Sequence, residues 1–286
     1  MRKSILYFIT VVAILSAFAC QDIITLDLNE QQTRVVIEGL ISDRVGSQSV
    51  RVSESLNYYD TIATPPIKDA EVSLLTKDGQ LIEAFSYSMT DSAYVPSPQF
   101  VGEIGREYIL QVIAKGETYQ AAGQIIRNAN LDSIYYFSKE QLELIGQNVF
   151  EGDYFLFVDG SLNSEMVEYF RLTVTVNDTL RNSRGDIANS VLSSEFFGSE
   201  FQFLPVPGDF VAQDSIHLEL YSLNEDIFQY YQEFTNLLFN DGGVFSPPPV
   251  NPTTNIINLT VQENYALGFV QFSSIIEKDL YLDEEE

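Results

Sequence analysis

The sequence predicts a mainly β protein, with an antiparallel β-sandwich over residues 33–127 and a second β-rich domain over residues 128–282 that carries one packed helix. Short segments in which apolar and polar residues alternate indicate half-buried strands. Gly, Pro and Asp residues separate these segments at short intervals, as in antiparallel all-β proteins. The 267 residues that follow position 19 are enough for two domains of ordinary size.

The first domain is predicted from five alternating segments. The clearest one places Tyr108, Leu110 and Val112 on one face of a strand and the intervening residues on the other. A Lys-Gly-Glu turn at residues 115–117 leads into the next strand. The other predicted strands of this domain lie near residues 34–38, 50–53, 70–74 and 118–122.

In the second domain, alternation predicts strands over residues 170–176 and 216–221. A last strand is predicted over residues 265–272, shortly before an acidic tail at residues 283–286. Because a run of like charges at a chain end is solvated, we expect this tail to have no part in the fold.

One helix is predicted near residues 224–240. Apolar residues from Ile227 to Leu238 recur at the helical spacing of three and four, which forms a single stripe along the helix. Ser222 and Glu225 have the spacing of a capping box, in which each side chain accepts a hydrogen bond from a free backbone N–H. We expect the stripe to cover a sheet face or the end of a barrel.

The amino terminus has the form of a lipoprotein signal peptide over residues 1–19. A positively charged start precedes an apolar run that is too short to span a membrane, which takes about 20 apolar residues. Cys20, the only cysteine, follows this run directly. We therefore expect cleavage before Cys20 and lipid on its sulfur, with residues 20–32 as a tether. The alternative is an ordinary cleaved signal with an incidental cysteine.

The chain is strongly acidic, with 15 basic and 41 acidic residues and a net charge of −26. Loss of residues 1–19 would remove Arg2 and Lys3 and no acid, which leaves 13 basic against 41 acidic residues and a net charge of −28. This charge argues against nucleic acid as a partner, because phosphates require a basic surface. It also disfavours lying flat on anionic lipid, whereas it favours solubility or a basic face on a protein partner.

The sequence shows no catalytic centre, and we expect no enzyme activity, no cofactor and no metal. His217 is the only histidine, so a serine triad, a histidine-based zinc site or a haem site would depend on it alone. Its place beside Glu219 on the polar side of a predicted strand indicates a surface residue. Pairs of acids could serve a glycosidase, but the sequence selects no pair. Walker, dinucleotide-binding and EF-hand motifs are absent.

Tyrosine pairs are the candidates for a ligand platform, since the chain has no Trp. They occur at residues 58–59, 135–136 and 230–231. Neighbouring side chains of a strand point to opposite faces, so we expect one member of a pair in a strand to be in the core. The helical stripe by itself explains Tyr230 and Tyr231.

Several segments together resemble a known family. Cys20 is followed by Val-Ile-Glu-Gly-Leu-Ile-Ser-Asp at 36–43, Pro-Ile-Lys-Asp-Ala-Glu-Val at 66–72, Gly-Arg-Glu-Tyr-Ile-Leu-Gln-Val at 105–112, Phe-Ser-Pro-Pro at 245–248, Asn255 and Gly268-Phe269. In order and spacing these segments resemble the DUF4249 lipoproteins of Bacteroidetes, over nearly the whole mature chain. Residues 66–119 alone are similar to carboxypeptidase-regulatory-like modules, which implies a transthyretin-like or Ig-like form for the expected sandwich.

The resemblance implies a role and a location, because the family has no assigned activity and supplies no catalytic residues. Its members are typically found beside TonB-dependent outer-membrane receptors. We therefore expect a non-enzymatic, lipid-anchored protein of the outer membrane that faces the cell surface and assists such a receptor as an accessory or lid in nutrient uptake. The alternatives are a carboxylate-dependent glycosidase, which a deep cleft with two facing acids would favour, and a structural or adhesion lipoprotein.

A short motif, Asp followed by Ser or Thr and an aliphatic residue, recurs along the chain and resembles the O-glycosylation sequon of Bacteroidetes envelope proteins. Asp-Ser and Asp-Thr are also good turn formers that precede strands, so both interpretations stay open. The hydroxyls concerned belong to Thr61, Ser92, Ser133, Thr179 and Ser215.

Overall fold

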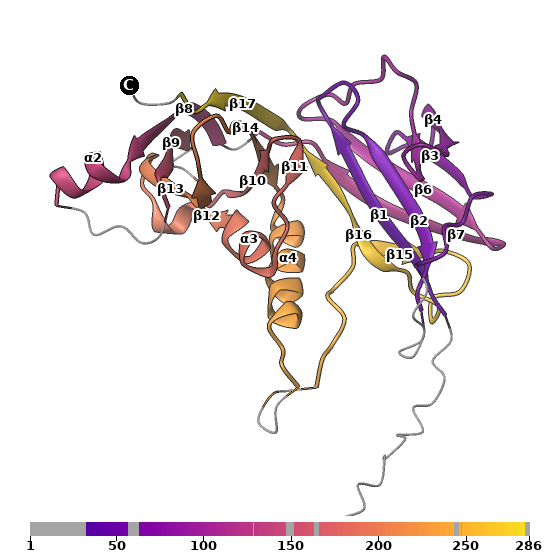
Figure 1. Cartoon of the computed structure of the whole chain (residues 1–286). Coiled ribbons are helices and arrows are strands. Elements are labelled where there is room, and N and C mark those ends of the chain that lie inside the picture. Colours follow the sequence, from indigo (N-terminus) through magenta and orange to yellow (C-terminus); the bar gives the residue numbers. More distant parts are fainter. Residues whose placement is uncertain are drawn as a thin grey trace, which may run out of the picture. The chain divides into compact units, whose positions relative to one another are not determined.

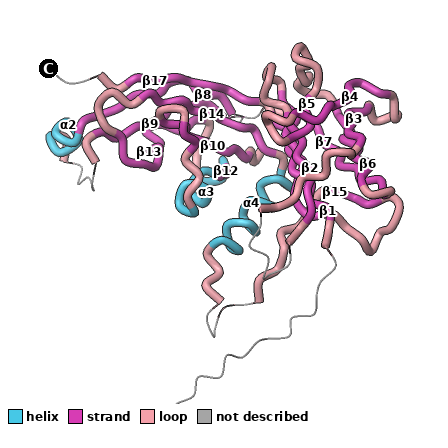
Figure 2. Tube along the Cα trace, turned by 45° about the vertical axis from the view of Figure 1, so that its right-hand side comes forward, coloured by secondary structure: helices cyan, strands magenta, loops and turns pink. Residues whose placement is uncertain are grey.

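The computed structural model describes residues 33–56, 63–127, 129–146, 152–162, 166–242, 246 and 248–283. Strands make up 51% and helices 13% of the described residues, so the predicted mainly β class is confirmed (Figure 2). The signal peptide predicted over 1–19, the tether over 20–32 and all but the first residue of the acidic tail lie outside the described residues. Within the described ranges, no helix has the length and apolar character needed to cross a membrane.

The largest sheet has nine strands and curls into a nearly closed barrel (Figure 1). Its strands in chain order are β1 (Val35–Ser42), β2 (Ser49–Glu54), β3 (Glu71–Leu75), β4 (Leu81–Ser88), β5 (Ala93–Val95), β6 (Glu107–Ala114), β7 (Glu117–Gln124), β15 (Ile256–Asn258) and β16 (Leu267–Ser273). In space they follow the order β15-β7-β6-β3-β4-β5-β2-β1-β16. Neighbours pair antiparallel, except that β1 and β16 run parallel.

The alternation in the sequence explains the barrel core. In β6, Tyr108, Leu110, Val112 and Ala114 are buried, while the residues between them remain partly or fully exposed. The same period of two places one row of apolar side chains from each long strand inside the barrel, where burial of their surface stabilises the fold.

The structure replaces the sandwich predicted for residues 33–127 with this barrel-like sheet. The reason lies in β15 and β16, which come from the range assigned to the second domain, 128–282, and extend the sheet at β7 and β1. A sandwich would leave strand edges with unpaired N–H and C=O groups, which closure of the sheet satisfies. The sheets therefore do not follow the expected boundary between residues 127 and 128.

The gap between β7 and β16 is bridged at two points. Just after β7, Ile126 forms a parallel bridge with Ser273. Farther along, the Asn255 side chain takes the place of a strand: its Nδ2 donates to the Val270 carbonyl at 2.9 Å, and its Oδ1 accepts from the Val270 N–H at 3.0 Å. Because Val270 is 1% exposed, these bonds satisfy backbone groups that water does not reach.

Two smaller sheets share a second core. One sheet has the order β13-β9-β8, and the other has β11-β10-β14-β17 with β12 also on β10. Buried residues of both sheets, including Leu156, Phe170, Phe201 and Leu218, form one cluster. The strands are β8 (Ala129–Ser138), β9 (Tyr154–Leu162), β10 (Tyr169–Val176), β11 (Thr179–Leu180), β12 (Val191–Ser193), β13 (Glu200–Phe210), β14 (Ser215–Leu223) and β17 (Ile275–Tyr281).

The predicted helix is confirmed as α4 (Glu225–Leu238), but its capping box is wrong. Ser222 still belongs to β14, so the helix begins after Asn224, whose side chain donates to the carbonyls of Gln124 and Phe272. In the described part of the chain, three short helices were not predicted: α2 (Lys139–Leu144), α3 (Arg184–Ser190) and the 3-10 turn η1 (Ser194–Phe196).

A buried serine cluster joins the barrel to the second core. The strand β16 continues through Ser274 into β17, so one segment serves the barrel and the five-stranded sheet. At this point the Ser273 hydroxyl donates to the Ser222 carbonyl at 2.7 Å, and the Ser222 N–H donates to the Ser274 carbonyl at 3.1 Å. All three serines are 1% exposed or less, so these bonds are required for their burial.

Candidate functional site

An open hollow of about 350 Å³ lies where α4 meets the barrel and the five-stranded sheet. Its volume is within the range of about 300–1,000 Å³ typical of small-molecule sites. Figure 1 shows α4 beside β10, β12 and β16, the strands that it contacts. The hollow is lined by Glu38, Gly39, Leu40, Ser49, Arg51, Ala93, Arg171, Tyr221, Tyr230, Tyr231, Phe234, Phe269 and Gln271.

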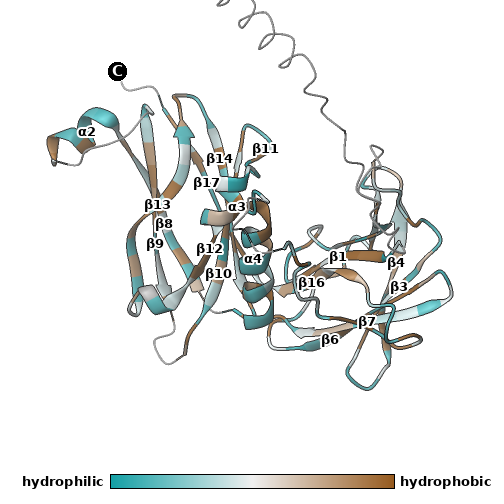
Figure 3. Ribbon diagram, turned by 90° about the horizontal axis from the view of Figure 1, so that it is seen from below, coloured by the Kyte–Doolittle hydropathy of each residue, from teal (hydrophilic) through white to brown (hydrophobic). Residues whose placement is uncertain are grey.

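The aromatic wall of the hollow comes mainly from the apolar stripe of α4. Only Ile227 of this helix is fully buried, whereas Tyr230, Tyr231 and Phe234 are half-buried. Tyr230 and Phe234 are nearly parallel, and the Tyr230 ring centroid is 4.9 Å from that of Phe269 in β16. Figure 3 shows hydrophobic and hydrophilic residues both present along α4. The predicted stripe is therefore fully buried only at Ile227, while Tyr230, Tyr231 and Phe234 keep part of their surfaces accessible.

A chain of hydrogen bonds fixes the polar wall of the hollow. The Arg171 Nη1 donates to the Tyr231 hydroxyl at 2.8 Å, and this hydroxyl donates to Gln271 Oε1 at 3.2 Å. The Gln271 amide then donates to the Ser273 hydroxyl at 2.9 Å, which anchors the chain in the buried serine cluster. The guanidinium of Arg171 also lies 4.7 Å from the centre of the Tyr231 ring, a cation–π distance.

Two phenols of the hollow, those of Tyr221 and Tyr230, have raised pKa values. Burial raises the pKa of Tyr221, and the charge of Glu219 and a 3.0 Å hydrogen bond to it act in the same direction. Burial also raises the pKa of Tyr230 to about 12. Glu38 is the one carboxylate of the lining, and it lies 3.8 Å from Arg51 on the neighbouring strand. The hollow therefore lacks the pair of facing acids that a glycosidase would need.

Sequence reasoning found part of this lining. It singled out Tyr230 and Tyr231 but assigned both to packing, and the structure places them on the wall of a hollow. It missed Arg171, Phe269 and Gln271, because single residues of these types on strands resemble ordinary surface or core positions. A sequence signal exists for Arg171 alone, as a basic residue within an apolar strand of a very acidic chain.

A second aromatic cluster, which we call the aromatic face, lies on the three-stranded sheet. Tyr135, Phe137, Phe157 and Phe203 point away from the shared core, which is packed instead by Tyr136 and Leu156. One tyrosine of the pair 135–136 was predicted to lie in the core, and Tyr136 is half-buried and packs against it. The ring centroids of Phe157 and Phe203 are 4.0 Å apart, and Phe203 is 40% exposed. Residues 58–59, the third pair, lie outside the described residues.

Phe203 reaches the aromatic face through a strained backbone. It lies in a register shift of β13 and has a φ of 57°, which is rare for a bulky residue and costs on the order of 1–3 kcal/mol. Asp159 holds it there, because its carboxylate accepts from the Phe203 N–H at 2.7 Å and from the Tyr135 hydroxyl at 2.8 Å. The bond from Phe203 is the largest cause of the lowered pKa of Asp159. Strain of this kind is concentrated at functional surfaces.

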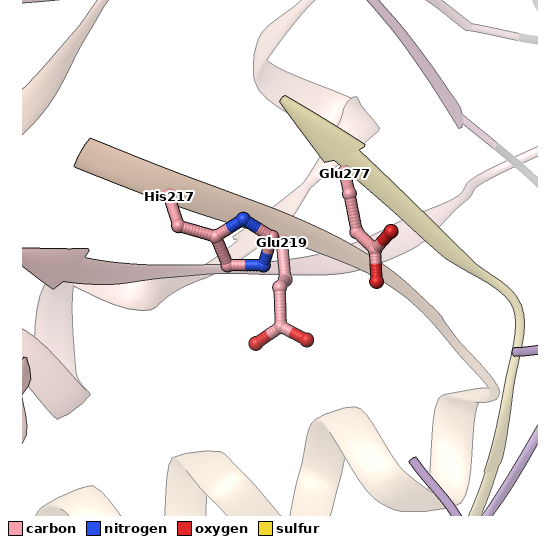
Figure 4. Close-up of side chains that lie close together, drawn as sticks. All are labelled: His217, Glu219 and Glu277. Carbon is pink, nitrogen blue, oxygen red and sulfur yellow. The ribbon is translucent and has the colours of Figure 1, made fainter. Parts of the chain in front are cut away.

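His217, Glu219 and Glu277 form a third cluster, with their potential metal ligands within 4.8 Å of one another (Figure 4). His217 and Glu219 come from β14, and Glu277 faces Glu219 from β17. Each side chain already has a protein partner. His217 Nδ1 lies 2.7 Å from Asp279, Arg44 pairs with Glu277 at 2.9 Å, and Glu219 accepts from the hydroxyls of Thr173 and Tyr221. We assign no metal to this cluster. Its side chains are already satisfied by a cation, by hydroxyl donors and by the pairing of His217 with Asp279.

The predicted modification sites are dispersed over the structure. Ser92 is exposed in a turn, and Thr179 and Ser215 are the exposed first residues of β11 and β14, so these motifs lie at a turn or at the start of a strand. Ser133 is half-buried in β8 and donates to Asp159 at 3.2 Å. Cys20 and Thr61 lie outside the described residues, so lipid attachment and glycosylation stay predictions.

The chain belongs to the family described as a domain of unknown function, DUF4249, whose sequence profile matches residues 21–279. This match covers the barrel, both smaller sheets and the aromatic hollow. No curated protein matches the chain.

Proposed function

We propose that the protein is a non-enzymatic, lipid-anchored accessory of a TonB-dependent outer-membrane transporter, which it contacts through the aromatic face. The observation that carries this proposal is Phe203, a 40% exposed phenylalanine in a strained conformation beside Phe157 and Tyr135. Aromatic residues are enriched at protein interfaces, where they contribute much of the binding energy. A strained, exposed aromatic residue contributes nothing to the core and is therefore best explained by a partner.

Three further features support the proposal. The resemblance of the sequence to lipoproteins found beside TonB-dependent receptors suggests the class of partner. The signal-like segment before Cys20 supports a lipid anchor. The net charge of −28 expected after cleavage favours docking on a complementary basic face rather than loose attachment to anionic lipid.

The test is a crosslinked pull-down from native membranes of cells that express the protein at its natural level. We expect a large outer-membrane transporter to be recovered with the wild type and to be reduced about tenfold or more by Phe203→Gln, since an interface anchor contributes about 2 kcal/mol or more. Phe239→Gln is the matched control, because Phe239 is 56% exposed at the end of α4 and away from the aromatic face. The proposal would be contradicted if the wild type recovered no transporter, or if Phe203→Gln and Phe239→Gln reduced the recovery of the transporter equally.

The anchor is tested separately by Cys20→Ser. We expect this variant to lose its lipid and to leave the membrane fraction at high salt. Retention in that fraction would show that the anchor lies elsewhere.

A further inference from the structure

The aromatic hollow contains a cation without an acidic partner. Arg171 is half-buried on β10, and among the described residues no carboxylate lies within 4.0 Å of its guanidinium. Because the charge of Arg persists at all physiological pH values and is costly to bury without compensation, a site that keeps it unpaired is suited to an anion.

The hydrogen bonds of Arg171 leave one side of the guanidinium available. Of its five N–H donors, one is directed to the Tyr231 hydroxyl and one to the Ser190 hydroxyl, at 2.8 and 3.4 Å. Three donors remain without a partner in the described part of the chain, enough for a carboxylate bound by two parallel hydrogen bonds. Tyr231, itself fixed by Gln271, holds the guanidinium in place before any ligand arrives.

The remaining charges of the hollow do not oppose an anion. Glu38 is offset by Arg51, and Tyr221 and Tyr230 are neutral phenols. Tyr230, Phe234 and Phe269 supply an apolar wall opposite the polar one, against which an aromatic ring can stack or pack edge to face.

We propose that this hollow binds an aromatic carboxylate, with the carboxylate on Arg171 and the ring against Tyr230 and Phe269. The proposal does not depend on the transporter, since it concerns a small molecule and a different surface from the aromatic face.

The test uses the purified full-length protein in detergent, with detergent alone as the blank. The probes are naphthoate, its neutral amide naphthamide, and glucuronate, which has a carboxylate but no aromatic ring. Because the chain has no Trp, naphthalene fluorescence can be excited where the protein does not absorb. Glucuronate is measured as a competitor of bound naphthoate.

We expect naphthoate to bind and naphthamide and glucuronate to bind at least tenfold more weakly. Arg171→Met should weaken naphthoate roughly tenfold to a hundredfold, which is the effect of removing a charge-assisted hydrogen bond. Tyr230→Leu should weaken it roughly threefold to tenfold. Arg106→Met is the matched control and should leave the affinity within about twofold, because Arg106 pairs with Glu103 and does not line the hollow.

Thermal unfolding of each variant establishes that it is folded before binding is measured. Arg171→Lys provides a second test if Arg171→Met unfolds, because it keeps the charge but loses the planar fork, and it should still weaken naphthoate. Absence of naphthoate binding at millimolar concentration, equal binding of naphthamide, stronger binding of glucuronate, or equal effects of the Arg171 and Arg106 substitutions would overturn the proposal.

Discussion

The barrel and the two smaller sheets both bury aromatic residues, but the smaller sheets and α4 also leave aromatic rings partly accessible. Inside the barrel, Tyr94, Tyr108 and Tyr119 are each 2% exposed or less, and each hydroxyl has a protein partner. Outside it, Phe203 on the three-stranded sheet and Tyr230 on α4 keep part of their rings accessible. Phe170, Phe201 and Phe210 are likewise buried between the smaller sheets, so this second region has both a stabilising aromatic core and candidate binding surfaces. The candidate functional surfaces of this protein are therefore those where aromatic residues stay partly exposed.

The largest expected effect lies in the barrel. Phe272 is 1% exposed and packs against Gly123, where any Cβ would overlap its ring. We expect Phe272→Ala to lower the free energy of unfolding by about 3–5 kcal/mol, because it leaves a cavity in a closed core. Denaturant unfolding followed by circular dichroism measures this loss.

Phe203→Ala is the matched change on the three-stranded sheet. We expect it to lower the free energy of unfolding by less than about 1 kcal/mol. Phe203 is 40% exposed, so the truncation removes little buried surface beyond the contact with Phe157, and Ala at the same positive φ keeps the backbone strain. Equal losses for Phe272→Ala and Phe203→Ala would break the comparison, since Phe203 would then be a structural residue.

Asn255 tests how the barrel closes. Asn255→Ala removes both hydrogen bonds to the buried Val270 backbone, and we expect it to cost about 1–3 kcal/mol. Asn255→Asp keeps the acceptor but loses the donor, so we expect it to lower the free energy of unfolding as well. Asn251→Ala is the control in the same loop, because Asn251 is exposed. If Asn255→Ala and Asn251→Ala unfold at the same denaturant concentration, the side chain does not close the sheet.

Glu117 provides a smaller effect that depends on pH. Its carboxylate accepts from Tyr119, Asn258 and Asn264 at 2.6–2.9 Å, and these bonds, that of Tyr119 first, lower its pKa below the ordinary value of 4.5. A carboxyl with a lowered pKa in the folded state stabilises the fold above its unfolded pKa and loses this effect as the pH falls through its folded pKa.

We therefore expect Glu117→Gln to be less stable than the wild type at pH 7, by less than about 1 kcal/mol because the group is close to solvent. The difference should shrink below about pH 4.5. Thermal unfolding at a series of pH values measures it, with Glu140→Gln on the exposed side of α2 as the control. A difference that stays constant down to acid pH would mean that Glu117 acts through shape and not through charge.

The smallest effect on stability is expected from glycan. If the Asp-Ser and Asp-Thr motifs are modified, the exposed hydroxyls of Ser92, Thr179 and Ser215 should carry glycan ahead of Ser133, which is half-buried and bonded to Asp159. Intact mass spectrometry of the native protein, followed by peptide mapping, measures this order. A mass equal to peptide plus lipid would leave the motifs as turns alone.

The sequence predicted those parts of the fold that depend on local pattern. Strands β6, β10 and β14 alternate cleanly, and α4 has a clear helical period, so all four were found. The barrel was not predicted, because its closure depends on β16 pairing in parallel with β1 from the opposite end of the chain. No local pattern encodes such a pairing.

The candidate sites were predicted even less completely, for a related reason. Tyr230 was recognised as part of a stripe, but whether a stripe is covered depends on what packs against it. Phe203 gave no signal at all, because its exposure results from a register shift and a positive φ that a phenylalanine rarely adopts.

The central claim, that accessible aromatic surfaces outside the barrel carry a role in uptake, is tested most directly by transport in cells. Uptake of the substrate of the neighbouring transporter would be measured at limiting concentration in cells that lack this gene. We expect reduced uptake, which returns with the wild type and with Phe239→Gln but not with Phe203→Gln at equal protein levels. Unchanged uptake in the deletion strain, or full recovery with Phe203→Gln, would contradict the claim.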